Sequence, residues 1–371
     1  MRVGLDARTL AAPFPSGVEH YVANLVRAFS QLADAPEIIA YTDRPISDPD
    51  IARAASSGPL RTQLLRARWG WLRVALPLQM RRDRIRVAHF PSTILPPLLP
   101  CPAVVTVHDL AWQRFPETYS PDDLAMQLRA LECAKRAARV ITTSESTARD
   151  LEEAGVPGRA ITVTPLGVSE QFSPDGPPLA PDAFPDADRL QQGYLLYVGR
   201  LHARKNLTRL LEAYKLLRAA QGVPPLVLAG TGDHYADRLK QGAQHLGLAD
   251  HVIFTGYFPA HLLPALYRGA TLFLYLSLYE GFGLPVLEAM ASGLPVVTSN
   301  VGGTAEVASD AGMVVNPDKP AEIADAVLLL LGDAGVRASF RERGLIRSRH
   351  FTWERTARET VAVYQHAAEV L

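Results

Sequence analysis

The feature that most constrains the fold of this sequence is the alternation of short apolar segments with longer segments of helical periodicity. The short segments are continuously apolar and rich in β-branched residues, which is typical of strands buried on both faces of a parallel sheet. They are residues 2–7, 37–42, 86–90, 103–108, 139–144, 194–199, 225–230, 251–256, 271–276, 295–299 and 312–315. Between the first two, apolar residues from Val18 to Leu32 recur at helical spacing. The repeated strand–helix order predicts an α/β fold.

A proline-rich segment, residues 172–190, divides the chain and contains few large apolar residues. We interpret it as a linker between two doubly wound domains, residues 1–171 with five of the predicted strands and 191–352 with six. We expect the two domains to face each other across a cleft. A last helix, residues 353–371, follows the second domain, and we expect it to cross back to the first.

Composition excludes several classes of protein. The 371 residues carry 38 basic and 38 acidic side chains, so the net charge is zero and a wholly basic nucleic-acid-binding surface is not expected. Cys101 and Cys133 lie far apart with no metal-binding spacing, which predicts neither a disulfide framework nor a structural zinc site. The first residues lack the pattern of a signal peptide, and no apolar stretch approaches the length of a membrane span. We therefore expect a cytoplasmic protein.

Ligands of open α/β sheets bind beyond the carboxyl ends of the strands, so the turns there are the places to look for chemistry. The turn after residues 194–199 holds Arg200, Arg204 and Lys205 where a helix is expected to begin. Cations at a helix amino terminus oppose its dipole, whereas an arginine and a lysine together suit a diphosphate. A solvated basic turn is the alternative.

Two further turns contain glycines. Gly17 stands where the first helix is expected to begin, which suits either close approach of a ligand or a plain loop with Ser16 as the helix cap. The segment LAGTGD, residues 228–233, contains Gly-x-Gly, but Tyr235 occupies the position of the third glycine of a dinucleotide-binding fingerprint. A nicotinamide-dependent dehydrogenase is therefore poorly supported.

The most informative segment follows the apolar run 271–276. Gly281 and Gly283 precede a predicted helix, and their backbone N–H groups can point at an anion. Glu280 stands just before these glycines, and Glu288 lies one turn into the helix near its apolar stripe. Carboxylates would repel a phosphate but accept hydrogen bonds from hydroxyl groups, so this segment predicts contacts with a sugar.

These residues resemble the retaining glycosyltransferases of family 4, which have the GT-B fold. The resemblance rests on the E-x7-E spacing of Glu280 and Glu288 in EGFGLPVLEAMASGLPVV, and it covers essentially the whole chain. The segments VGRLHARKN, LAGTGD, VIFTGY, VGGTAEV, SGVEHY and VTVHDL follow the order and spacing of that family. The amino-terminal half, with GLDAR, HFPST and HDLAWQRFPETY, is most similar to the mannosyltransferase-B-like branch, which builds O-antigen and related bacterial polysaccharides.

The resemblance implies a role for each matching residue. Glu288 would bind the ribose hydroxyls, Glu280 would lie against the transferred sugar, and His108 of the first, acceptor-side domain would line the reactive carbon. The implied donor-binding residues are Gly17, Arg200, Lys205, Gly230, Tyr257, Gly281, Phe282, Gly283, Leu284 and Glu288. Among these, the two cations would neutralise the diphosphate, and the backbone near Tyr257 would hold the base. The family's usual Gly-Gly or Gly-Ile-Gly first loop is replaced here by Ser-Gly-Val-Glu around Gly17.

The resemblance further implies a nucleotide-sugar as donor, with GDP-mannose as the first candidate, and a saccharide or lipid-linked diphosphate sugar as acceptor. No Asp-x-Asp pair stands in a suitable turn, so we expect the arginine and lysine to replace a divalent cation and expect no cofactor. Three alternatives stay open. They are a UDP-sugar donor, a glycoside hydrolase that uses Glu280 and Glu288 as acid and base, and a nucleotide-sugar-binding protein without turnover.

One more segment, the basic strip of residues 61–86, combines arginines with tryptophans and leucines. Its arginines are Arg61, Arg66, Arg68, Arg73, Arg81, Arg82, Arg84 and Arg86, against the single acid Asp83. Such a strip can lie on an anionic membrane surface, which would place the protein peripherally on the inner face of the plasma membrane. A solvated helix pair whose tryptophans belong to the core is the equal alternative.

Overall fold

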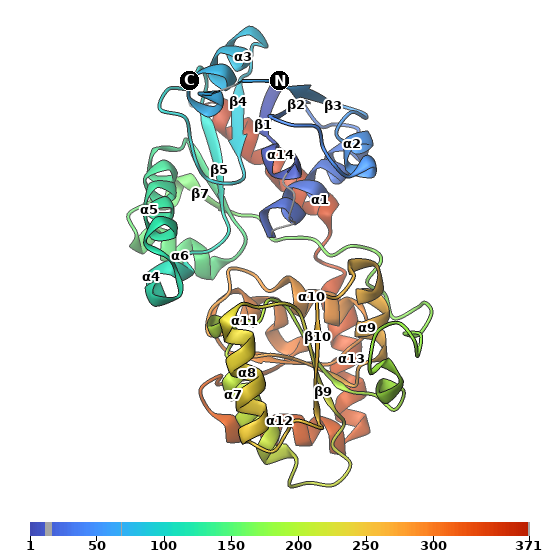
Figure 1. Cartoon of the computed structure of the whole chain (residues 1–371). Helices are drawn as coiled ribbons and strands as arrows, with labels where there is room; N and C mark the ends of the chain where they lie inside the picture. The colour runs from blue at the N-terminus through green and yellow to red at the C-terminus, as the bar shows by residue number, and fades with distance from the viewer. Residues whose placement is uncertain (12–16, 68, 370–371) are drawn as a thin grey trace. The chain divides into compact units, whose positions relative to one another are not determined.

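The computed structural model describes residues 1–11, 17–67 and 69–369 of the chain (Figure 1). The chain divides into two compact units. The first comprises Met1–Gly167 and Thr352–Leu371, and the second comprises Val168–Phe351. Each unit is built around its own parallel sheet, as the apolar segments of the sequence predict.

The first unit contains, within its described residues, a seven-stranded sheet in the order β3-β2-β1-β4-β5-β6-β7. The strands are β1 (Arg2–Asp6), β2 (Glu37–Thr42), β3 (Leu60–Leu64), β4 (Val87–Phe90), β5 (Ala103–Val107), β6 (Arg139–Thr142) and β7 (Ile161–Val163). Every neighbouring pair is parallel; Val3, for example, pairs with both Ile38 and Val87. The order reverses between β1 and β4, which is the switch point of a doubly wound sheet.

Helices cover both faces of this sheet. They are α1 (Gly17–Gln31), α2 (Pro49–Ala54), α3 (Leu76–Arg82), α4 (Ala111–Arg114), α5 (Pro121–Arg136), α6 (Glu145–Glu153) and α14 (Trp353–Ala368), with the short turns η1 (Arg8–Ala11), η2 (Trp71–Ala75), η3 (Pro116–Thr118) and η4 (Gly158–Ala160). The predicted apolar stripe of α1 is buried from Tyr21 to Phe29. Ser120 and Ser144 cap α5 and α6 by accepting hydrogen bonds from backbone N–H groups, which explains why those helices begin where they do.

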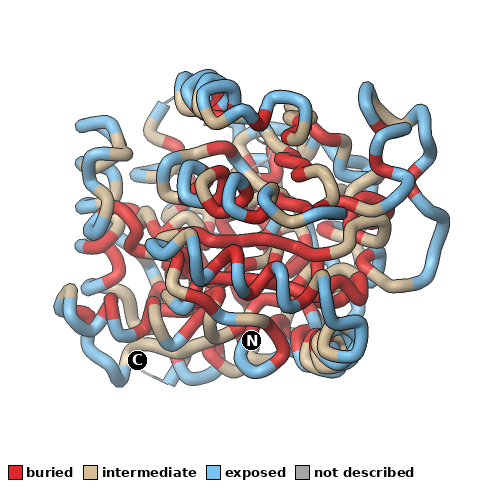
Figure 2. The backbone as a smooth tube through the Cα atoms, turned by 90° about the horizontal axis from the view of Figure 1, so that it is seen from below, coloured by how far each residue is buried: buried red, intermediate tan, exposed pale blue. Residues whose placement is uncertain are grey.

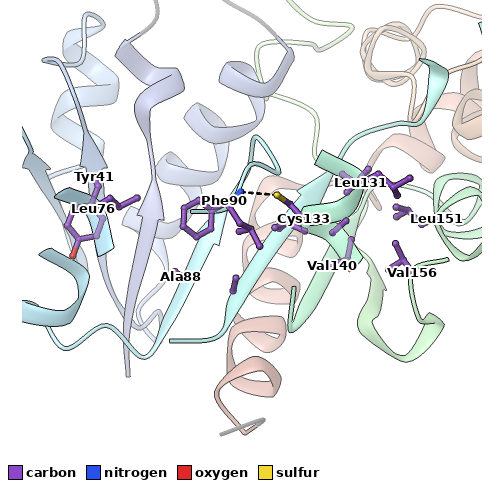
Figure 3. Packing of buried hydrophobic residues seen from close by; sticks show 14 of the residues in the cluster. Tyr41, Leu76, Ala88, Phe90, Leu131, Cys133, Val140, Leu151 and Val156 are labelled. Carbon is purple, nitrogen blue, oxygen red and sulfur yellow. Dashed lines mark hydrogen bonds between the residues drawn. The ribbon is translucent and has the colours of Figure 1, made fainter. Parts of the chain in front are cut away.

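The core of the first unit extends from Tyr41 of β2 and Leu76 of α3 to Leu151 of α6 and Val156, which follows that helix (Figure 3). Cys133 belongs to this core, and its Sγ accepts a hydrogen bond from the Leu95 backbone N–H at 3.4 Å. Along the backbone the central strands are buried, while the helices alternate between buried and exposed residues (Figure 2). That alternation is the pattern of helices packed against a sheet on one side only.

The second unit repeats the same topology with a six-stranded parallel sheet in the order β10-β9-β8-β11-β12-β13. The strands are β8 (Leu195–Val198), β9 (Leu226–Ala229), β10 (Val252–Gly256), β11 (Leu272–Tyr275), β12 (Val296–Ser299) and β13 (Met313–Val315). The helices are α7 (Leu207–Leu217), α8 (His234–His245), α9 (Leu263–Gly269), α10 (Leu284–Ala291), α11 (Gly302–Ala308), α12 (Pro320–Gly332) and α13 (Ala334–Ser348), with the turns η5 (Ala187–Leu190), η6 (Ala203–Lys205), η7 (Ala260–Leu262) and η8 (Ser309–Ala311).

Two strands of the first unit, β3 and β7, were not predicted, so the expectation of five strands was wrong. Both are edge strands with one neighbour each. In β3 the polar residues Arg61, Thr62 and Gln63 interrupt the apolar pattern, and most of the strand is exposed. The strand β7 has only three residues, all partly exposed. Edge strands need not be apolar on both faces, so a search for continuous apolar runs misses them.

The proline-rich segment 172–190 does not stand apart from the domains, as a linker would, but falls within the second unit. Phe172 is buried with its ring edge-on to Tyr267 at 5.6 Å, and Arg268 donates to the Pro177 carbonyl at 2.9 Å. The few apolar residues of the segment therefore anchor it to α9, which composition alone does not reveal.

The last helix, α14, returns to the first unit as expected. Its Tyr364 hydroxyl forms a hydrogen bond of 2.8 Å with Nδ1 of His89 in β4, and its ring packs on Phe29 of α1. His89 and Tyr364 are both fully buried. This buried polar pair fixes the position of the returning helix, since neither group has water as an alternative partner.

Candidate active site

In the second unit the strand order reverses between β8 and β11, so the loops that follow these two strands lie side by side at the carboxyl edge of the sheet. The loop after β8 carries Arg200, Arg204 and Lys205, and the loop after β11 carries Glu280. Two segments about which the sequence made separate predictions are thereby brought together.

Lys205 and Glu280 form the centre of this arrangement. The Lys205 ammonium group pairs with Oε1 of Glu280 and donates to the Tyr275 hydroxyl at 3.0 Å, and that hydroxyl lies 3.2 Å from the same carboxylate oxygen. A guanidinium nitrogen of Arg204 lies 3.6 Å from Oε2 of Glu280 and donates to the Tyr279 carbonyl at 2.9 Å. Two of the three cations that oppose the helix dipole are thus compensated by one buried carboxylate.

Electrostatics decide the ionisation of Glu280, which is only 9% exposed. Burial by itself raises the pKa of a carboxyl group, but the charges of Lys205 and Arg204 and the hydrogen bond from Lys205 outweigh it and hold the pKa of Glu280 below its ordinary value. The site therefore contains one fixed negative charge between two positive charges. An incoming phosphate can compete with Glu280 for the same two cations.

The structure does not bring Arg200 to Glu280. Arg200 instead pairs with Asp233 at 2.6 Å, and both side chains are exposed. Since exposed ion pairs contribute little to stability, this pair leaves Arg200 available to exchange Asp233 for another anion. Sequence reasoning did not identify Asp233 as its partner.

Glu288 lies on α10, and its Oε2 accepts a hydrogen bond from the Tyr267 hydroxyl at 2.9 Å. Burial raises the pKa of Glu288 to about 7, although the bond from Tyr267 acts in the opposite direction. The rings of Tyr267, Phe273 and Tyr275 follow one another at 5.4 and 5.8 Å, so an aromatic row connects the partner of Glu288 to the partner of Glu280.

The glycine-rich loop between the two glutamates has the geometry that a backbone-lined site requires. Gly283 precedes α10 with a φ of +107°, and a Cβ atom there would lie 2.8 Å from Cγ2 of Thr304. The Gly303 N–H, at the start of α11, donates to the Glu280 carbonyl at 2.8 Å. The other predicted members of the loop are Gly281, Phe282 and Leu284; the Phe282 ring is buried against Phe351, which leaves only its backbone for a ligand.

Gly230 and Tyr257 lie in neighbouring turns, because Gly230 forms a bridge with Gly256. Gly230 has a φ of +152°, and a Cβ atom there would lie 1.9 Å from the Gly199 carbonyl oxygen. No other residue type fits this position. The Tyr257 side chain is 77% exposed, so its ring is accessible to a ligand.

In the first unit, His108 directly follows β5 and lines a cavity of about 560 Å³. The imidazole packs edge-on against Tyr21 at 5.0 Å and forms a hydrogen bond with the Pro91 backbone. Its Nε2 is buried without a hydrogen-bond partner among the described residues. Burial lowers the pKa of His108 despite the opposing charge of Asp109, so the ring is neutral at neutral pH.

The same cavity is mostly apolar, with Trp112, Met126 and Leu131 among its lining residues. Arg8 adds a positively charged side chain to the lining. Arg8 makes a two-pronged ion pair with the buried Asp6, with contacts of 2.9 and 2.7 Å. Its guanidinium also lies 4.5 Å above the Trp71 ring. These contacts hold Arg8 in one orientation, which sequence reasoning did not anticipate.

Gly17 is the first residue of α1, and a Cβ atom there would have no described atom within 4 Å. Ser16, the predicted cap, lies outside the described residues. The open space at Gly17 is compatible with close approach of a ligand.

The basic strip contains both buried and exposed aromatic and apolar residues. Trp71 and Leu76 are buried in the core of the first unit, whereas Trp69 is 84% and Leu78 is 53% exposed. Arg61, Arg66, Arg73, Arg81, Arg82, Arg84 and Arg86 are all exposed, and Arg68 lies outside the described residues. The strip therefore presents arginines on the surface together with four exposed large apolar side chains, Leu64, Trp69, Val74 and Leu78.

Among the described residues, no group of three or more histidine, cysteine, aspartate and glutamate side chains is placed to hold a metal ion. In the same part of the chain, no helix is long and apolar enough to span a bilayer.

Sequence reasoning missed Tyr267 and Tyr275 as members of the site. A tyrosine in a buried helix or strand needs a partner for its hydroxyl, so each was a detectable signal of a polar group nearby. What the sequence lacked was the identity of that partner. Asp233 and Arg8 carried no comparable signal, since exposed charges in turns are common.

Comparisons with known proteins cover both units. The family described as Glycosyltransferase Family 4 matches residues 15–172, and the family described as Glycosyl transferases group 1 matches residues 183–347. The chain is 34% identical over 285 residues to the O-antigen chain mannosyltransferase B of Escherichia coli, a match that spans 75% of this chain and 74% of the relative.

Solved structures share the fold. The sucrose-phosphate synthase of Thermosynechococcus elongatus superimposes with a TM-score of 0.76 and 21% identity, over 100% of both chains. Anabaena HepE in complex with UDP-glucose gives a TM-score of 0.71 and 21% identity, over 100% of this chain and 98% of that one.

Proposed function

The chain belongs to the family 4 glycosyltransferases, and we propose that it transfers a mannosyl group from GDP-mannose to a glycan or lipid-linked acceptor in bacterial polysaccharide synthesis. The observation that carries the transferase chemistry is the meeting of Lys205 and Arg204 with Glu280 beside a glycine-rich loop. The choice of mannose rests on the similarity to the O-antigen chain mannosyltransferase B.

In this proposal the bond between the anomeric carbon and the β-phosphate oxygen breaks, and the acceptor oxygen forms the new bond on the same face. The departing diphosphate gains negative charge as the sugar becomes cationic. Lys205 and Arg200 neutralise that charge, with the N–H groups of Gly281 to Leu284 as further donors. The acceptor hydroxyl loses its proton to an oxygen of the leaving phosphate, so configuration is retained.

Each remaining predicted residue has a proposed contact. The ionised carboxylate of Glu288 accepts hydrogen bonds from the ribose hydroxyls, and its pKa of about 7 makes that contact sensitive to pH. Gly230 and Tyr257 lie near the base. In the first unit, Gly17 approaches the phosphate and the free Nε2 of His108 accepts a hydrogen bond from a sugar hydroxyl.

We further propose that the cavity beside His108 receives the acceptor. Its apolar walls and its fixed Arg8 suit a substrate with both an apolar surface and a negative charge, as a lipid-linked diphosphate sugar has. The exposed arginines and Trp69 of the basic strip belong to the same unit and would hold the protein at an anionic membrane where such acceptors reside.

The test of donor identity is a thermal-shift screen with GDP, UDP and ADP, followed by product analysis with the matching mannose or glucose nucleotide. A ligand that binds the native state raises its unfolding temperature in proportion to occupancy. We expect GDP to give the largest shift and GDP-mannose to yield an α-linked product. A larger shift with UDP would instead favour the UDP-sugar alternative. Binding without any transfer to a range of acceptors would favour a non-catalytic binding protein.

A further inference from the structure

A second cavity, of about 400 Å³, lies within the second unit. Thr271 and Pro295 line it, and they immediately precede β11 and β12. The cavity is therefore at the amino edge of the sheet, whereas Glu280 follows the carboxyl end of β11. The arginine-lined part of the cavity therefore lies apart from Lys205 and Glu280, although Tyr267, whose hydroxyl donates to Glu288, also lines it.

Three arginines line the cavity, Arg268 from α9 and Arg337 and Arg341 from α13, and no aspartate or glutamate is among its lining residues. None of the three makes an ion pair with a carboxylate in the part of the chain that the structure describes. Three positive charges therefore converge on one cavity without a compensating negative charge. Arg341 is exposed and the other two are partly buried, so an anion that enters the cavity meets three positive charges that solvent only partly screens.

The arginines are held in place by backbone carbonyls. Arg337 donates to two carbonyls at the end of α12 at 2.8 and 3.1 Å, and Nε of Arg341 donates to the Gly293 carbonyl at 3.2 Å. Arg268 donates to carbonyls of the segment before η5. A guanidinium has five N–H groups, so each arginine keeps donors for a ligand, in an orientation that the carbonyls already fix.

Two polar groups of the lining have no partner. Oγ of Ser292 and Nε of Arg268 are buried without a hydrogen bond among the described residues, and Ser292 as a whole is only 4% exposed. Buried polar groups nearly always have partners in folded proteins. Both residues line the cavity, so a ligand with acceptor oxygens can supply the missing partners once these side chains turn toward it.

We propose that this cavity binds a small soluble molecule that bears a phosphate or diphosphate group, in addition to the nucleotide-sugar of the active site. Arginine forks match the oxygens of a phosphate, and a serine hydroxyl adds a further donor. The volume is within the range of small-molecule sites. The inference goes beyond the proposed function and does not depend on it.

The test uses inorganic pyrophosphate as the probe, measured by isothermal titration calorimetry on the full chain. All measurements use the Lys205→Ala background, which removes one of the two cations that the proposed function assigns to a diphosphate at the active site. We expect the Lys205→Ala protein to bind pyrophosphate. Adding Arg341→Ala should weaken this binding at least about tenfold, which is the loss expected for one charged hydrogen-bonding partner.

Arg343→Ala is the matched control, because Arg343 lies on the same helix but donates to the Asp310 carbonyl and lies over the Phe340 ring. It should leave the affinity unchanged. Ala338→Glu, at an exposed lining position, is a second variant that should block binding by placing a carboxylate in the cavity. The proposal is overturned if the Lys205→Ala protein binds no pyrophosphate, or if Arg341→Ala and Ala338→Glu both bind as tightly as that background.

Discussion

Lys205 and Glu280, 75 residues apart in the chain, form a largely buried ion pair at the point where the strand order of the second unit reverses. Glu280 thereby does two things. In the absence of substrate it neutralises the positive charges of Arg204 and Lys205 in the loop after β8. It also keeps these two side chains oriented toward the loop where the sugar nucleotide is proposed to bind. A site organised in this way needs little rearrangement when charge develops on a leaving phosphate.

We expect Lys205→Ala to reduce turnover at saturating donor by at least about a hundredfold, because a cation aimed at the leaving group is lost. Initial rates of transfer, together with circular dichroism to confirm folding, measure this. Lys215→Ala, an exposed lysine on the neighbouring helix α7, is the control and should keep full activity. Turnover within a few fold of the parent protein would remove Lys205 from the mechanism.

Glu288 should make stability depend on pH. Its pKa is about 7 in the folded protein against an ordinary value of 4.5, so between these values the folded state holds a proton that the unfolded state releases. Stability from this group is therefore full below about pH 4.5 and is lost as the pH rises to 7. The loss between pH 5 and pH 8 should amount to about 2–3 kcal/mol.

Glu288→Gln removes this titration, so we expect the variant to gain stability over the parent protein as the pH rises from 5 to 8, while its nucleotide affinity falls. Urea unfolding at both pH values measures the first effect, and calorimetric titration with GDP measures the second. A stability difference that does not change with pH would contradict the raised pKa.

Gly230→Ala and Gly242→Ala should change stability in opposite directions. At Gly230 a Cβ atom would lie 1.9 Å from a carbonyl oxygen, and φ is +152°, so we expect a loss of about 2–4 kcal/mol. At Gly242, within α8, a Cβ atom would meet nothing within 4 Å, and alanine should stabilise the helix by about 0.5–1 kcal/mol. The urea midpoints of the two variants measure these changes in stability. Equal midpoints would show that the backbone at Gly230 can shift to accommodate a Cβ atom.

Membrane binding by the basic strip predicts that Arg81→Glu with Arg82→Glu weakens association with phosphatidylglycerol-containing liposomes at least about tenfold, since each basic residue near such a surface contributes about 1 kcal/mol. Raising the salt concentration should have the same direction of effect. Arg238→Glu with Lys240→Glu, on α8 of the second unit, changes the charge equally and should leave sedimentation with liposomes unaffected. Equal loss from both pairs would show a response to net charge alone.

Much of the fold could be predicted from the sequence because buried parallel strands are continuously apolar. That pattern identified every strand except β3 and β7, and it failed for β3 because the polar residues of that strand lie at the sheet edge. It also failed for residues 172–190, because Phe172 and Leu179 are too few to show that the segment packs on the second unit.

For the site, the sequence by itself determined which residues have unusual chemistry for their position: Glu280 and Glu288 around two glycines, and Arg204 and Lys205 at a helix start. Those signals are local, since each depends on spacing within one loop or helix. Only the tertiary structure decided which of them meet. The sheet order places β8 beside β11, so that Lys205 can pair with Glu280. Helix packing lets the Tyr267 hydroxyl of α9 donate a hydrogen bond to Glu288 of α10. The ionisation of each carboxylate depends on those partners and on burial, which no spacing along the chain contains.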